Sequence, residues 1–118
     1  MRQLEIYFMS CIFCNIIKGK LPSKMVYQDD QVVAFYDINP KAKVHILIVP
    51  RKHIASVNQV KSEDRAILGS LFLAAQKIAE MQGIAEEGYR LTVNTGSAAG
   101  QIVYHLHMHL LGGGVFND

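Results

Sequence analysis

The stretch His105-Leu106-His107-Met108-His109-Leu110-Leu111, near the C-terminus, alternates histidine with apolar residues. Successive side chains of a β-strand point to opposite faces of a sheet, so this alternation predicts a strand with the three imidazoles on one face and the apolar spacers in the core. Imidazoles held this close together can bind a metal ion, hold a phosphate, or supply a nucleophile. The surrounding sequence has to decide between these uses.

A small polar loop leads into the histidine strand, Asn94-Thr95-Gly96-Ser97-Ala98-Ala99-Gly100-Gln101. Glycine lets the backbone approach a ligand closely, and main-chain N–H groups in such a loop can surround an anion. The loop therefore favours phosphate chemistry over a plain metal site at the histidines.

The pattern along the rest of the chain predicts an α+β fold, with a mostly antiparallel sheet, one long helix and a short N-terminal helix. The apolar run at 45–49 is typical of a central strand buried on both faces. Ser62 is the expected cap of the long helix, which ends at Gly83. The other expected elements are a helix over 15–20 and strands over 25–28, 32–37, 89–94 and 103–111.

Composition and charge narrow the class of protein. A chain of 118 residues with a net charge of +2 predicts one globular domain and no basic stripe for nucleic acid. No apolar run approaches the ~20 residues that span a bilayer, and no secretory signal is recognisable, so we expect a cytoplasmic protein without membrane contact. Residues 1–8, which precede Met9-Ser10-Cys11, are expected to be an N-terminal extension and residues 9–118 a single domain.

From Cys11 to Gly113 the chain resembles the histidine-triad (HIT) nucleotide-binding proteins, whose signature alternates histidine with apolar residues. The glycine-rich exit Gly112-Gly113 is most similar to the purine nucleoside phosphoramidase branch. The other matching blocks are Ile12-Phe13 with Ile16-Ile17, Phe35-Tyr36-Asp37-Ile38-Asn39-Pro40, His45-Ile46-Leu47-Ile48-Val49-Pro50-Arg51-Lys52-His53-Ile54, and Gly100-Gln101. The resemblance implies the HIT-like fold and a homodimer formed through residues 62–94.

The resemblance also implies a hydrolase that acts on AMP or GMP derivatives, with no organic cofactor. His107 would attack the α-phosphorus to form a nucleotidyl-histidine that water then cleaves. His109 and His45 would contact the phosphate, with Asp37 on the ribose hydroxyls. The implied nucleotide-binding residues are Ile12, Phe13, Ile16, Leu21, Phe35, Asp37, Ile38, Asn94, Gly100, Gln101, Val103, His107 and His109; by composition alone the apolar ones would be core residues.

Cys11 and Cys14 form a Cys-x-x-Cys pair, which favours metal or redox chemistry over a structural disulfide in a chain without a secretory signal. In members of the family with this pair, the pair and two histidines bind structural zinc. Carried over to this sequence, the resemblance implies a zinc site made by Cys11, Cys14, His53 and His105.

Two departures from the family pattern concern the leaving group. Ile102 stands where the branch usually has a serine, and the chain has no tryptophan at its C-terminal end. A changed substrate range or a slower enzyme is therefore expected. Two alternatives stay open at this point: a dinucleoside polyphosphate hydrolase that uses the same nucleophile, and a non-catalytic nucleotide-sensing or partner-binding module.

Overall fold

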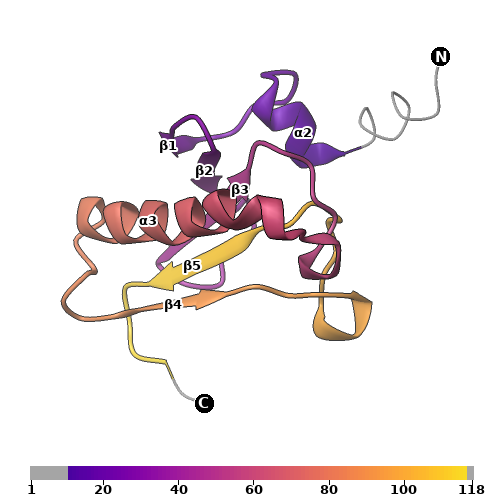
Figure 1. Cartoon of the computed structure of the whole chain (residues 1–118). Helices are drawn as coiled ribbons and strands as arrows, with labels where there is room; N and C mark the ends of the chain where they lie inside the picture. Colours follow the sequence, from indigo (N-terminus) through magenta and orange to yellow (C-terminus); the bar gives the residue numbers. More distant parts are fainter. Residues whose placement is uncertain (1–10, 117–118) are drawn as a thin grey trace.

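A five-stranded antiparallel sheet forms the frame of the protein in a computed structural model that describes residues 11–116 (Figure 1). The strand order is β1-β2-β3-β5-β4, so the fourth strand in sequence lies at an edge and the fifth lies inside the sheet. This architecture confirms the predicted α+β class with an antiparallel sheet. The predicted extension over residues 1–8 lies outside the described residues. The strands are β1 (Met25–Gln28), β2 (Val32–Tyr36), β3 (Val44–Pro50), β4 (Tyr89–Thr92) and β5 (Met108–Gly112).

β3 is the central strand, as its apolar sequence predicts. It pairs with β2 on one side and with β5 on the other, and its residues from His45 onward are buried. Alternate side chains of β3 enter two separate clusters: Ile46 and Ile48 pack on one face of the sheet, and Leu47 and Val49 pack on the other. The sheet therefore has a core on each face.

The long helix α3 (Arg65–Met81) covers one face of the sheet (Figure 1). It begins two residues later than predicted, because Ser62–Asp64 forms a 3-10 turn first. The predicted cap is also wrong, because Asp64 rather than Ser62 occupies the N-cap position of α3. The Asp64 carboxylate accepts the backbone N–H of Lys61 at 2.9 Å and the Lys52 ammonium at 2.6 Å. At the other end, Gly83 has a φ of +72°, the left-handed conformation that commonly ends a helix.

The short helix α2 (Ile12–Ile17) packs on the opposite face, where Phe13 and Cys14 join Phe35, Leu47 and Val49. The sequence predicted this helix over 15–20. It starts earlier because the Cys11 thiol accepts the backbone N–H of Cys14 at 3.4 Å and thereby caps the first turn. Two further 3-10 turns span Val57–Gln59 and Ser97–Ala99. No helix among residues 11–116 has the length and apolarity to cross a membrane.

The histidine stretch is only partly a strand, which corrects the predicted strand over 103–111. β5 begins at Met108, so His109 is the one triad histidine within it. The reason is that the pairing of β5 with β3 starts at Met108 opposite Ile48. Before that point the chain contacts the loop after β3, with the Leu106 N–H donating to Ile54 O at 2.6 Å. The apolar spacers Leu106, Met108 and Leu110 are buried in the core beneath α3, as predicted.

Candidate active site and metal centre

A cavity of about 450 Å³ opens on the face of the sheet opposite α3. Two of the triad histidines, His107 and His109, line it together with His45 from the neighbouring strand β3. The third, His105, is fully buried and is not among the lining residues. The structure therefore separates the triad into a pair that faces the cavity and a histidine that faces elsewhere.

His107 has one ring nitrogen fixed by the backbone. Its Nδ1 lies 2.7 Å from the main-chain oxygen of His105, and since a carbonyl can only accept, Nδ1 carries the proton. In the neutral ring, Nε2 then keeps its lone pair. Burial lowers the pKa of His107 below the usual 6.5, more strongly than the hydrogen bond to His105 raises it. At neutral pH, His107 is thus a neutral imidazole with a fixed orientation and an unprotonated Nε2, the state in which a histidine can act as a nucleophile.

His45 and His109 form a hydrogen-bonded pair whose proton positions also follow from the backbone. The N–H of Lys41 donates to His45 Nδ1 at 3.0 Å, so the neutral His45 ring carries its proton on Nε2. His45 Nε2 lies 2.9 Å from His109 Nδ1, so it donates there and leaves His109 protonated on Nε2. Burial, with His107 and His45 nearby, lowers the pKa of His109 to about 4. His109 is therefore a neutral N–H donor beside the cavity.

The remaining cavity lining divides into an apolar wall and a polar side. Phe13 packs edge-on against Phe35, with ring centroids 5.5 Å apart. Asp37 lines the cavity at the end of β2 and accepts the N–H of Asn39 at 2.7 Å, which fixes its carboxylate. The predicted binding residues that line the cavity are Ile12, Phe13, Ile16, Phe35, Asp37, Ile38, Asn94, Gly100, Val103, His107 and His109.

Two predicted binding residues do not line the cavity. Leu21 lies in the exposed loop after α2. The Gln101 amide is buried and committed to the loop around it: it accepts the N–H of Gly96 at 2.9 Å and donates to Ala55 O at 2.8 Å. Gln101 therefore holds the polar loop in shape, and its side-chain oxygen and nitrogen are already used within the protein.

Lys41 is a site residue that the sequence analysis missed. Its backbone orients His45, and its side chain is among the cavity-lining residues, where it is the lysine available to an anion. In the sequence it appeared only as one of several scattered loop lysines. Its position four residues before His45 gave the available signal, because a turn brings that backbone N–H to the ring. Ile102, 87% exposed, also lines the cavity.

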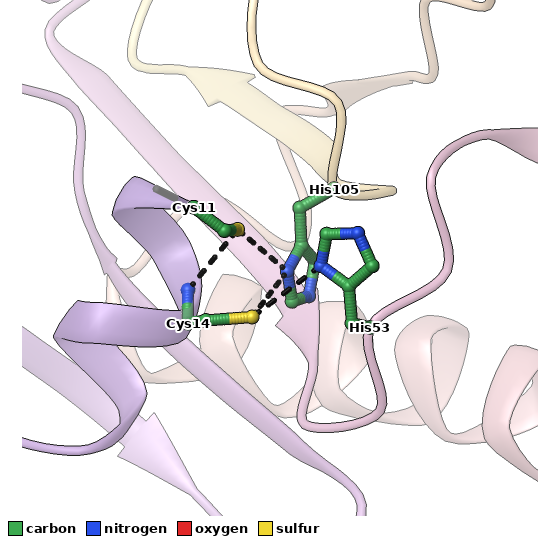
Figure 2. A group of neighbouring side chains, drawn as sticks. All are labelled: Cys11, Cys14, His53 and His105. Carbon is green, nitrogen blue, oxygen red and sulfur yellow. Dashed lines mark hydrogen bonds between the residues drawn. The ribbon is translucent and has the colours of Figure 1, made fainter. Parts of the chain in front are cut away.

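A second group of side chains includes the remaining triad histidine: Cys11, Cys14, His53 and His105 point toward one another (Figure 2). The Cys11 thiol is 3.4 Å from His105 Nδ1, and the Cys14 thiol is 3.5 Å from the same nitrogen and 3.3 Å from His53 Nδ1. The four candidate ligand atoms all lie within 4.8 Å of one another. The structure thus brings together all four residues that the sequence predicted as metal ligands.

The chemistry of this group suits a metal ion. His105 Nε2 donates to Pro50 O at 2.8 Å, which leaves the Nδ1 lone pair directed at the thiols. Tetrahedral zinc, with bonds of about 2.3 Å to sulfur and 2.05 Å to nitrogen, would hold these atoms about 3.6 Å apart, close to the separations observed. Burial raises the pKa of the Cys14 thiol to about 12, and a bound cation is what would ionise it.

Asp37, His45 and His109 form another cluster of potential ligands within the described residues. Here the hydrogen bonds argue against a metal. His45 Nε2 carries a proton that it donates to His109, and its Nδ1 is occupied by the Lys41 N–H. Ligation by His45 would cost one of these bonds. This cluster is therefore better suited to donating hydrogen bonds into the cavity.

Comparison with known proteins gives consistent matches over most of the chain. The sequence model of the HIT domain family matches residues 18–115. A purine nucleoside phosphoramidase of Escherichia coli K12 is 56% identical over 102 residues, which are 86% of each chain. A HIT family hydrolase from Legionella pneumophila superposes with a TM-score of 0.90 at 44% identity, covering 92% of this chain and 96% of that one. A HIT family hydrolase from Clostridium thermocellum also gives 0.90, at 52% identity and coverages of 92% and 95%.

Proposed function

This chain belongs to the HIT domain family and is a hydrolase, and from that premise we propose that it cleaves phosphoramidate and related bonds at the α-phosphate of purine nucleoside 5′-monophosphate derivatives. The family membership confirms the resemblance found in the sequence. The purine nucleoside phosphoramidase to which the chain is 56% identical supports the choice of substrate class.

The observation that carries the proposal is the orientation of His107. With its Nδ1 proton held by His105 O at 2.7 Å, its Nε2 lone pair is available to attack phosphorus. The bond from the α-phosphorus to the leaving nitrogen breaks, the electron pair departs with the amine, and the amine takes a proton from solvent water; the attacking water of the second step returns a proton to solvent. The product on the enzyme is a nucleotidyl-histidine. Water then attacks the same phosphorus, breaks its bond to Nε2 and releases the nucleoside monophosphate.

The neighbouring groups have roles that follow from their protons. Neutral His109, protonated on Nε2, can donate to a phosphate oxygen as negative charge develops, while His45 keeps it in that tautomer. The Lys41 ammonium adds positive charge on the same side of the cavity. The Asp37 carboxylate can accept from ribose hydroxyls, and the wall made by Ile12, Phe13, Ile16 and Phe35 can receive the purine.

The test is mass spectrometry of the protein after brief incubation with adenosine 5′-phosphoramidate, quenched without acid, together with an assay for AMP. We expect a nucleotidyl adduct and AMP release in the wild type and neither with His107→Ala or His107→Asn. The second variant keeps a polar group of similar size without the nucleophile. If AMP bound without adduct or turnover, the non-catalytic alternative would replace this proposal. Faster cleavage of a dinucleoside polyphosphate would favour the other hydrolase.

We further propose that Cys11, Cys14, His53 and His105 bind structural zinc. A closed set of two thiolates and two imidazoles leaves no open position for substrate, so the ion would supply stability rather than reaction chemistry. Native mass spectrometry and elemental analysis of protein purified without chelator should find about one zinc per chain. Protein that is fully folded yet free of metal under these conditions would contradict the assignment.

The homodimer and the cytoplasmic location belong to the same proposal. The outward side of α3 exposes Phe72 and Leu73, 59% and 62% exposed, and β4 is an unpaired edge of the sheet. A second copy could cover both.

A reducing compartment suits the two free thiols of the proposed zinc site, because an oxidising one would favour a disulfide between them.

A further inference from the structure

We propose that the metal centre positions the nucleophile: closing Cys11, Cys14, His53 and His105 around an ion fixes the main chain of His105 and the ring of Phe13 against His107. This inference rests on the proposed function of His107. It assigns the centre a role in catalysis through geometry, in addition to its effect on stability. Two independent contacts connect the centre to the nucleophile.

The first contact runs through one residue, His105. Its ring is fully buried, with Nδ1 facing the two thiols and Nε2 donating to Pro50 O at 2.8 Å. Its main-chain oxygen, 2.7 Å from His107 Nδ1, accepts the proton that determines the tautomer of the nucleophile. A displacement of the His105 ring would therefore be passed to the carbonyl that orients His107.

The second contact runs through α2. Phe13 lies between the two cysteines in sequence, and its ring meets the His107 ring nearly perpendicularly, with centroids 5.0 Å apart and an interplanar angle of 86°. It also lies 6.0 Å from the His105 ring. Because α2 has only six residues, its own hydrogen bonds provide little stability, and binding both cysteines would hold Phe13 in place.

The segment around His105 needs such support. The pairing of β5 with β3 ends at Met108, so His105 and His107 are not paired with a residue of β3. The Leu106 N–H to Ile54 O bond and the His105 Nε2 to Pro50 O bond attach this segment to the end of β3 and the loop after it, whereas the His107 ring bond stays within the segment. The catalytic ring is thus carried on an irregular backbone next to four metal-ligating side chains.

The decisive experiment compares zinc-loaded protein with protein treated with a chelator, using nitrogen-15 NMR of the histidine rings. In the loaded protein, His107 should show a single tautomer with the proton on Nδ1. After zinc removal, we expect averaging between tautomers and a fall of about 10- to 100-fold in the rate of adduct formation, because a misplaced nucleophile loses its aligned approach. AMP affinity should change less than the rate of adduct formation, since His45, His109 and Lys41 on the phosphate side supply none of the metal ligands and only the purine wall on α2 is held by the centre.

Two variants separate positioning from a general loss of structure. Phe13→Leu keeps all four ligands and should bind zinc fully, yet slow adduct formation and perturb the His107 ring signals. His53→Ala removes the ligand that lies in the loop after β3, outside both α2 and the histidine stretch, and should reproduce the effect of the chelator even if Cys14→Ser fails to fold.

A single Nδ1–H tautomer and an unchanged adduct rate in folded, zinc-free protein would overturn the inference. So would a Phe13→Leu protein with wild-type ring signals and rate. Absence of an adduct in the wild type would instead refute the proposed function, and the NMR comparison of His107 would still decide whether the centre positions its ring.

Discussion

At the residue scale, main-chain atoms determine what each histidine of the site can do. His107 and His105 each donate to a carbonyl, while His45 accepts from an N–H. In a neutral imidazole, fixing one nitrogen fixes the role of the other. One residue type therefore supplies a candidate nucleophile at His107, a candidate metal ligand at His105 and a hydrogen-bond donor at His109 within a single short stretch.

The hydrogen bond between His45 and His109 leads to a first prediction. His45→Leu should lower kcat by about tenfold or more, because His109 loses the partner that holds its proton on Nε2, while AMP affinity changes little. His45→Gln, whose amide can still donate, should recover part of the loss. Steady-state kinetics with the phosphoramidate substrate provide the measurement. Equal activity of the Leu and Gln variants would mean that the 2.9 Å contact has no catalytic consequence.

The buried state of His109 gives a second prediction, for stability against pH. Its pKa is lowered from 6.5 to about 4 by burial and by His107 and His45, with Lys41 acting in the same direction and Asp37 against it. The unfolded chain therefore binds more protons than the folded chain between these pH values. The free energy of unfolding should fall as the pH falls from 6.5 to 4.

Urea denaturation at several pH values across this window tests the effect. His109→Gln, which cannot titrate, should show a shallower dependence than the wild type. Some dependence will remain, because burial also lowers the pKa of His105 to about 4. An identical slope in variant and wild type would show that His109 is not the neutral, buried group described here.

The identities of the site residues could largely be predicted at this scale, whereas their partners could not. His45, His107, His109 and Asp37 are expected from the resemblance to the HIT family, and the structure brings them to one cavity. The bond between His45 and His109 joins residues 64 apart, so no local pattern indicates it. Gln101 has a side chain suited equally to a ligand and to its own loop, and only the packed structure shows that the loop uses it.

At the scale of single elements, strand ends were harder to predict than strand centres. β3 has a continuous apolar sequence, and the structure places it between β2 and β5, as that sequence predicts. The alternation of histidine and apolar residues begins before the first residue of β5. Leu106, which precedes the strand, and Met108, which starts it, are both buried in the same core. The alternating sequence of residues 105–107 therefore predicted a strand, although this segment makes no ladder hydrogen bonds with β3.

The exit from β5 supports a third prediction. Gly113 has a φ of +87°, and an added Cβ would lie 2.8 Å from Lys43 Cβ. Gly113→Ala should therefore lower the free energy of unfolding by about 1–3 kcal/mol through backbone strain and crowding. Gly114→Ala is the matched control, since Gly114 has no atom within 4 Å of that position and no positive φ. Thermal unfolding of the two variants should differ; similar midpoints would contradict the strain.

At the scale of the whole molecule, the outward side of α3 gives a fourth prediction. If Phe72 and Leu73 lie in a homodimer interface, Leu73→Glu should weaken dimerisation at least about tenfold, because a charge would be buried against the apolar surface of the partner. Val57→Glu, at a residue that is 48% exposed and lies in the 3-10 turn Val57–Gln59 rather than in α3, serves as the control. Light scattering over a dilution series measures the shift. A monomeric wild type would refute the predicted dimer.

The strand order has a consequence for synthesis on the ribosome. β1, β2 and β3 are neighbours in both sequence and sheet, but β5 lies between β3 and β4 and is the last strand to be translated. A nascent chain that stops before Met108 leaves the edge of β3 open and lacks His109, so nucleotide cannot assist its folding through the complete phosphate site. Emergence of β5 from the ribosome would thus complete the sheet and the candidate phosphate site in one event.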